Sequence, residues 1–178
     1  RGDLWFGSYN RGVVRISRKG ATTYTRLNGL RSNSIRQFFE DKAGNVWIAT
    51  GSGLSCWDGH ALKTYYLEDG LAYGSVRVIT QDRQGDLLVG TDGGANRLRN
   101  GKFIQDPLLA QIGIERVWAI LEDSGGGLWL GTRGGGLFRV KTGKVTRYTT
   151  RDGLLSDSVF QLLEDRRGRL WMTGPAGI

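Results

Sequence analysis

The chain has very few of the residues on which many catalytic and metal sites depend. It contains one cysteine, one histidine and two prolines in 178 residues. Cys56 alone cannot form a disulfide within the chain or build a cysteine-rich zinc site, and His60 alone gives little basis for a Ser-His-Asp set. The low proline content excludes a proline-rich linker. No apolar run approaches the roughly 18 residues that a membrane-spanning helix needs.

Glycine and aromatic residues are abundant, by contrast, and they follow a repeat. The strings DLWFGS, NVWIAT, DLLVGT, GLWLGT and RLWMTG recur at spacings of 42, 41, 41 and 42 residues. Acidic turns such as EDKAGN precede all but the first string with the same period. We interpret the equivalent central positions as structural residues of the repeat: Trp5, Trp47, Leu88, Trp129 and Trp171. We expect Trp47 and Trp129 to be buried between repeats.

Each repeat predicts four short strands separated by Gly, Asn and Asp. Within one repeat we expect strands over residues 34–41, 45–50, 53–58 and 62–67, since short runs bounded by turn residues are typical of strands. No helical periodicity persists over three turns. A four-stranded unit of this length is typical of a propeller blade. The sequence therefore predicts an all-β protein, a β-propeller of about four blades that forms a fragment of a larger propeller.

We expect a single propeller segment over residues 1–178. Its repeats are a partial blade at 1–27, blades at 28–67, 68–106 and 107–149, and a partial blade at 150–178. The first partial blade lacks a first strand, and the last lacks a third and a fourth. Because unpaired strand edges bind other strands, we expect these ends either to form a homo-oligomer or to contact the rest of a larger polypeptide.

The repeat resembles that of the two-component regulator propeller family. The resemblance is carried by NGLRSNSIRQFFEDKAGNVWIATGSGL from Asn28, DGLLSDSVFQLLEDRRGRLWMTG from Asp152 and GKVTRYT from Gly143. It implies the periplasmic sensor region of a bacterial histidine kinase or hybrid two-component regulator, many of which respond to carbohydrates, with no catalytic residues. Two features depart from the family pattern: Leu88 replaces Trp, and residues 104–116 lack the Asp-Gly-Leu connection.

Positions that differ between repeats are candidates for ligand binding, because a site needs an asymmetric cluster. The residue after the first-strand aliphatic is Arg36, Arg77, Trp118 or Phe160, and the loops entering these strands include Tyr73 and Arg116. In a propeller these positions gather at the mouth of the central channel. Aromatic rings stack on sugars, and guanidinium groups pair with carboxylate or sulfate, so we expect an oligosaccharide or another small ligand here. The alternative is that these residues only tune blade packing.

Other candidate sites have simpler structural explanations. The repeated Glu-Asp pairs are turn residues rather than paired catalytic acids, and the glycine-rich strings lack the Lys-Ser/Thr and helix of a P-loop. We place His60 at a hairpin tip and Cys56 in a packed strand, and we expect no metal and no cofactor. The net charge is +8, but the basic residues are dispersed along the chain and do not form one stripe. This dispersal disfavours a nucleic-acid partner. Contact with a membrane would need segments outside this chain.

Three functions follow from these patterns. We favour a ligand-sensing or signal-relay propeller segment, with a protein-interaction scaffold as the alternative. A propeller lyase is a third hypothesis, which the single histidine argues against.

Overall fold

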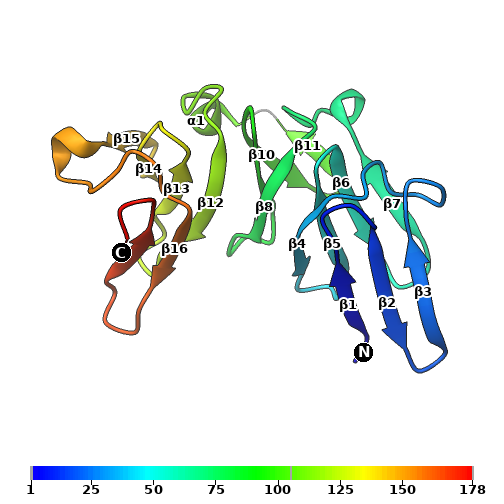
Figure 1. Ribbon diagram of the computed structural model, residues 1–178. Coiled ribbons are helices and arrows are strands. Elements are labelled where there is room, and N and C mark those ends of the chain that lie inside the picture. Colours follow the sequence, from blue (N-terminus) through cyan, green and yellow to red (C-terminus); the bar gives the residue numbers. More distant parts are fainter. Residues whose placement is uncertain (1, 105, 178) are drawn as a thin grey trace.

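The computed structural model describes residues 2–104 and 106–177, so Arg1, Gln105 and Ile178 of the expected repeats lie outside the described residues. Five antiparallel sheets follow one another along the chain (Figure 1). The first contains β1 (Leu4–Gly7), β2 (Val13–Ser17) and β3 (Gly20–Tyr24). The second contains β4 (Ile35–Glu40), β5 (Val46–Thr50), β6 (Gly53–Trp57) and β7 (Leu62–Tyr65).

The remaining sheets repeat this order. The third contains β8 (Val76–Gln81), β9 (Leu87–Thr91), β10 (Gly94–Arg99) and β11 (Lys102–Ile104). The fourth contains β12 (Val117–Glu122), β13 (Leu128–Thr132), β14 (Leu137–Lys141) and β15 (Lys144–Tyr148). The fifth contains β16 (Gln161–Glu164) and β17 (Leu170–Thr173). In every sheet, consecutive strands are hydrogen-bonded neighbours.

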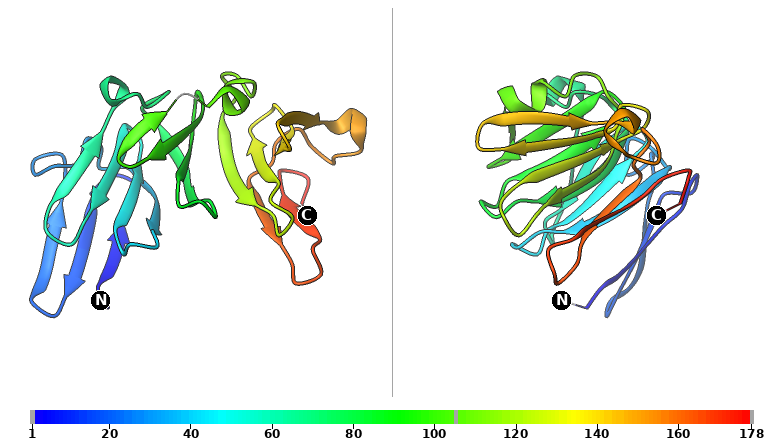
Figure 2. Two further views of the ribbon diagram at one scale, coloured as in Figure 1. Left: turned by 180° about the vertical axis from the view of Figure 1, so that it is seen from behind. Right: turned by 90° about the vertical axis from the view of Figure 1, so that its left-hand side faces the viewer.

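The sheets stand side by side in an open arc, and the predicted all-β propeller architecture is confirmed. Strands β4, β8, β12 and β16 contact one another in this order. They form the inner side of the arc, while β7, β11 and β15 lie on its outer side (Figures 1 and 2). The first and last sheets therefore lie at opposite ends of the arc.

One short helix departs from the all-β prediction. Helix α1 (Pro107–Ala110) lies in the segment that lacks the Asp-Gly-Leu connection, whereas two equivalent connections form 3₁₀ turns, η1 (Leu67–Asp69) and η2 (Thr150–Asp152). The Asp106 carboxylate accepts hydrogen bonds from the backbone amides of Leu108 and Leu109 at 3.0 and 3.3 Å. Pro107 occupies the first turn, where its missing N–H costs nothing. These local signals favour a short helix where other repeats form a turn.

Neighbouring sheets approach closely at the glycine of the second strand. A Cβ atom on Gly131 of β13 would lie 2.8 Å from both the Cγ1 and the carbonyl oxygen of Val159. A Cβ atom on Gly90 of β9 would lie 2.8 Å from Val117 Cγ1. Each glycine thus leaves room for the segment that leads into the next inner strand. This contact gives the Gly-Thr pair in the repeat a packing role.

The expected burial of tryptophan holds for Trp47 but is wrong for Trp129. Trp47 is 6% exposed and packs in a cluster that includes Leu98 and, at its margin, Phe103 of the following sheet. Trp129 is only partly buried. The reason is that the sheet after Trp129 has two strands among the described residues and lacks the outer strands that cover Trp47.

The Glu-Asp pairs of the turns make structural hydrogen bonds within and between sheets. The carboxylates of Asp41, Asp123 and Asp165 accept from the indole N–H of the tryptophan six residues later, at 2.8, 2.7 and 3.0 Å. In two of the pairs the preceding glutamate also caps the turn of the previous sheet, since Glu122 accepts from the Arg83 amide at 2.7 Å and Glu164 accepts from the Ser124 amide at 2.6 Å. These contacts explain why the pair recurs.

Candidate functional site

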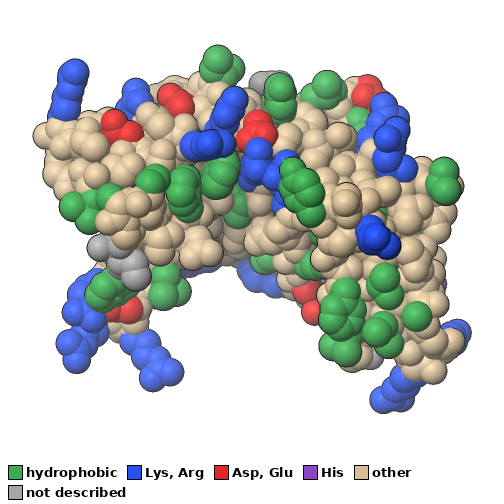
Figure 3. Space-filling model, in the orientation of Figure 1, with side chains coloured by type: hydrophobic (Ala, Val, Ile, Leu, Met, Phe, Trp, Pro, Cys, Tyr) green, Lys and Arg blue, Asp and Glu red, His purple; other side chains and the backbone are tan. Residues whose placement is uncertain are grey.

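A cleft of about 760 Å³ runs along the inner side of the arc, where strands β4, β8, β12 and β16 face it. The space-filling view shows the molecule hollowed between its two end sheets (Figure 3). Four of the six sequence-predicted ligand residues line this cleft: Arg36, Arg77, Trp118 and Phe160. The structure therefore brings together residues that lie about 40 positions apart in the sequence.

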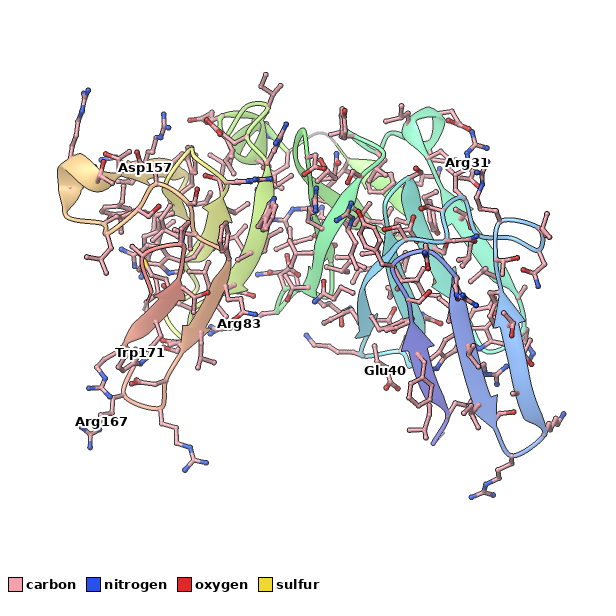
Figure 4. The ribbon with its side chains drawn as sticks, viewed as in Figure 1. Arg31, Glu40, Arg83, Asp157, Arg167 and Trp171 are labelled. Carbon is pink, nitrogen blue, oxygen red and sulfur yellow. The ribbon has the colours of Figure 1, made fainter. Side chains whose placement is uncertain are left out.

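Three of these four side chains each stand at a β-bulge of their own strand. The pairing of β4 with β5 skips Arg36, that of β8 with β9 skips Arg77, and that of β12 with β13 skips Trp118. A bulge residue has no partner on the neighbouring strand, and its side chain is re-aimed. All three bulges occur at the same end of the inner strands, the end marked in Figure 4 by Arg31 and Asp157 and opposite to Glu40 and Arg83.

Arg77 is held in place by Asp92, which begins the turn between β9 and β10. The Nε and Nη2 atoms of Arg77 donate to the two carboxylate oxygens of Asp92 at 2.8 and 2.7 Å. Burial alone would raise the pKa of Asp92, but the hydrogen bonds and charge of Arg77 outweigh it and lower the pKa. Asp92 is therefore ionised at neutral pH, and the pair forms a fixed two-point contact.

Trp118 is surrounded by protein groups. The guanidinium carbons of Arg77 and Arg133 lie 4.9 and 5.3 Å from its ring centroid, and the ring of Phe160 lies 5.0 Å away at an interplanar angle of 33°. The indole Nε1 is buried and has no hydrogen-bond partner among the described residues. A sugar that stacked on this ring would have to displace one of these neighbours.

Arg36 differs from Arg77 because it lacks a carboxylate partner. Within the described residues no acid lies within 4 Å of its guanidinium, and its Nε atom is buried with no acceptor. Burial lowers the pKa of Arg36 and the charge of Arg77 lowers it further, while the charge of Asp92 opposes both effects without outweighing them. The cleft thus contains one neutralised arginine beside one that is not neutralised.

The other two predicted ligand residues lie outside the cleft. Arg116 lines a separate depression of about 460 Å³ with Ile114, Glu115 and Arg133. Tyr73 is half exposed and lies against Gly93 in the turn between β9 and β10. Both residues belong to the loops that lead into inner strands, but neither loop turns its side chain into the cleft.

Comparison with known proteins assigns the fold to a family. The model of the family described as "Two component regulator propeller" matches residues 29–52, 70–93, 112–134 and 153–175, which together make up just over half of the chain. The chain belongs to this family. Each of the four matched segments of this regulator propeller contains one of the four cleft residues Arg36, Arg77, Trp118 and Phe160.

Sequence and structure comparisons agree with this assignment. Histidine kinase P4 of Formosa agariphila is 37% identical over 43 residues, which are 24% of this chain and 3% of that protein. The extracellular domain of a putative hybrid two component system from B. thetaiotaomicron superimposes with a TM-score of 0.78 and 18% identity, covering 98% of this chain and 25% of the other. The regulator propeller thus spans a small part of both relatives.

Other propellers share the fold. A virginiamycin B lyase from Staphylococcus aureus superimposes with a TM-score of 0.70 and 18% identity over 96% of this chain and 59% of the lyase. At this identity the likeness concerns the fold alone. Among the described residues of the regulator propeller, no cluster of three His, Cys, Asp or Glu side chains has the arrangement of a metal site, and no helix has the length and apolarity to cross a membrane.

Asp92 and Arg133 were missed by the sequence analysis, although the repeat contains a signal for them. Both follow the threonine of the Gly-Thr pair, at the position that Gly51 and Pro175 occupy in other repeats. The charge at this position differs between repeats, and so does the charge at the position of Arg36 and Arg77 on the inner strands. Comparing the variable positions within each repeat would have linked Asp92 with Arg77.

Two other expectations concern Cys56 and His60. Cys56 is buried in β6, and burial raises the pKa of its thiol to about 12, so it is a packed, protonated side chain. His60 is exposed in the turn between β6 and β7, where its backbone amide donates to Asp58 at 2.8 Å. Neither residue lines the cleft.

Proposed function

We propose that this regulator propeller is a non-enzymatic, ligand-binding segment of a bacterial two-component sensor, and that the inner cleft binds a saccharide or a similar small ligand. The observation that carries the proposal is the identity of the lining residues. The repeat keeps its structural positions nearly constant, but the four equivalent cleft positions hold two arginines and two different aromatic residues. A volume of about 760 Å³ suits a ligand of oligosaccharide size.

An extracytoplasmic location is part of this proposal. It is supported by membership of the family and by the likeness in fold to an extracellular domain of a hybrid two component system. A ligand that binds across β4, β8, β12 and β16 would contact four sheets at once. Such binding would favour one relative arrangement of the sheets, which is a route for relaying a signal to other parts of a sensor.

A role in catalysis is disfavoured by the chemistry of the cleft. The lining contains arginine, glutamine, threonine, aromatic and aliphatic residues, and no carboxylate or histidine stands among them to act as a general acid or base. A protein-interaction scaffold remains the second candidate. It is favoured by the exposed loop residues Tyr73 and Ile114, which precede β8 and β12 at the end of the inner strands where the bulges lie.

A saccharide panel with matched variants tests the proposed function. We expect saccharides that bind to raise the unfolding temperature of the 178-residue chain, and the triple change of Arg36, Arg77 and Trp118 to Ala to remove this effect. Arg26→Ala, at an exposed loop position, is the control and should leave binding unchanged. Binding of the same saccharide to the triple variant with wild-type affinity in a calorimetric titration would place the site elsewhere.

A further inference from the structure

The cleft has an imbalance of charge at the bulge end. Two guanidinium groups, Arg36 and Arg77, line it side by side on β4 and β8, and the single carboxylate near them is Asp92. Asp92 uses both of its oxygens on Arg77. One positive charge is therefore left without a partner in the described part of the chain, in a place where the surrounding protein limits solvation.

The two arginines have separable roles in this arrangement. Arg77 donates from Nε and Nη2 to Asp92, and its Cζ atom lies 4.9 Å from the Trp118 ring centroid, so its charge already has a partner within the protein. Arg36 makes no such contacts, and its buried Nε atom lacks an acceptor. A buried donor without a partner is unfavourable, and an acceptor supplied by a ligand would offset this cost.

We propose that the ligand of this cleft carries an oxyanion, a carboxylate or sulfate on a small saccharide, and that the anion pairs with Arg36. This inference rests on the proposed ligand-binding function and adds the charge of the ligand and the residue that reads it. Arg77 is a positioning residue, because it lies beside Trp118 and because Asp92 already matches its charge and its Nε–Nη2 edge. Guanidinium and oxyanion form two parallel hydrogen bonds, which are strong where water is partly excluded.

The pKa of Arg36 supports this role. Burial lowers it first, and the charge of Arg77 adds to the effect, so the bare cleft disfavours the charged form of Arg36. An anion placed against Arg36 supplies an opposite charge, which offsets the repulsion from Arg77 and compensates for the lost hydration. The ligand charge and the unpaired arginine therefore stabilise one another.

The first test uses inorganic sulfate as a probe of the anion subsite. Side-chain ¹H–¹⁵N signals of arginine Nε and tryptophan Nε1 are recorded while sulfate replaces chloride at constant ionic strength. We expect saturable shifts of the Arg36 and Trp118 signals in the wild-type chain. Arg36→Gln should weaken the affinity at least about tenfold, or about 1.4 kcal/mol, and Arg26→Gln should not change it. Non-saturable shifts, or equal affinity in Arg36→Gln, would overturn the proposal.

The second test separates this inference from the proposed function. Digalacturonate and its dimethyl ester have the same sugar skeleton and differ in charge. We expect the free acid to compete with sulfate in the wild-type chain and the ester not to compete. If both bind the cleft with one affinity that Arg36→Gln leaves unchanged, the anion subsite is wrong and the ligand-binding function stands. If sulfate binds at Arg36 but no saccharide in the panel binds, the function fails while the subsite holds.

Two further readouts distinguish the arginines. Arg77→Gln should move the Trp118 indole signal before any anion is added, because the indole loses a neighbour, whereas Arg36→Gln should leave that signal in place. Arg36→Gln also removes an unpaired charge, so its urea midpoint should equal or exceed the wild-type value. A clear loss of stability in Arg36→Gln would show that Arg36 has a structural partner and would contradict the proposal.

Discussion

Tryptophan at the repeated position depends on its neighbours for burial. Trp47 stacks on Tyr65 at 5.8 Å between centroids, and Trp129 stacks on Tyr148 at 6.0 Å, so each packs on the outermost strand of its own sheet. The difference arises on the other side, where the following sheet covers Trp47 completely and Trp129 only in part. Burial therefore varies along the chain although the sequence motif is constant.

This difference predicts unequal effects of the same substitution. Trp47→Ala should lower the free energy of unfolding by about 3–5 kcal/mol, because a fully packed ring leaves a cavity. Trp171→Ala, at a position that is 44% exposed, should cost less than half as much. Urea denaturation of both variants measures this. Equal losses would mean that Trp171 is covered in solution.

Leu88 shows how the repeat compensates for a missing tryptophan. Arg97 lies opposite Leu88 in the pairing of β9 with β10. Its guanidinium donates to Asp82, which occupies the position whose carboxylate accepts from the indole in other repeats, and also to Asp86 and Asp106 at 3.2 and 2.9 Å. The turn carboxylate thus keeps a donor, and the donor comes from a different strand.

The turn carboxylates also predict how stability depends on pH. Hydrogen bonds from Trp171 and Arg169 lower the pKa of Asp165 to about 2, below the value of about 3.9 for an unperturbed aspartate. A lowered pKa in the folded state contributes stability above the unfolded value, and this contribution is lost as pH falls from about 4 towards 2. Unfolding free energies measured across this range should fall less steeply for Asp165→Asn. An unchanged acid dependence would contradict the prediction.

At the scale of elements, the spacing between sheets depends on glycines in the second strands. Gly131→Ala should lower the free energy of unfolding by about 1–3 kcal/mol, because the new methyl group meets Val159 backbone and side-chain atoms at 2.8 Å. Gly74→Ala is the matched control, since the nearest atom to its Cβ would be Ser52 Cα at 3.8 Å. Urea midpoints compare the two. A tolerated alanine at position 131 would show that the sheets separate readily.

At the scale of the molecule, the two end sheets present complementary faces. Leu163 and Trp171 are cross-strand partners on β16 and β17, at the positions where Phe39 and Trp47 pack against the next sheet. Leu4 and Phe6 on β1 occupy the positions of Leu87 and Val89, which receive such a face. All four end residues are exposed, and Figure 1 shows their sheets at opposite ends of the arc.

We therefore expect copies of the chain to associate end to end. The apparent mass in light scattering should rise with protein concentration, since each copy would bury apolar surface that is otherwise exposed. Leu163→Glu should suppress this rise. Leu27→Glu is the control, because Leu27 is 97% exposed in the loop between β3 and β4 and is on neither β1 nor the β16–β17 pair. A monomer at all concentrations would exclude the end-to-end contact.

The sequence by itself determined the repeating parts of this protein. Turn residues and alternating apolar positions act over a few residues, so they predicted the four strands of a repeat, which the structure has at 35–40, 46–50, 53–57 and 62–65. The period also predicted that Arg36, Arg77, Trp118 and Phe160 would gather, because equivalent positions of neighbouring blades must be adjacent in space.

Only the tertiary structure decided which of these side chains have partners. The pairing of Arg77 with Asp92, the packing of Trp118 by Arg133 and Phe160, and the lone charge of Arg36 depend on groups from different strands. The same holds for the partial exposure of Trp129 and for Arg116 and Tyr73, which lie outside the cleft. A repeat sets the backbone positions by local forces, whereas the environment of each side chain is set by non-repeating neighbours.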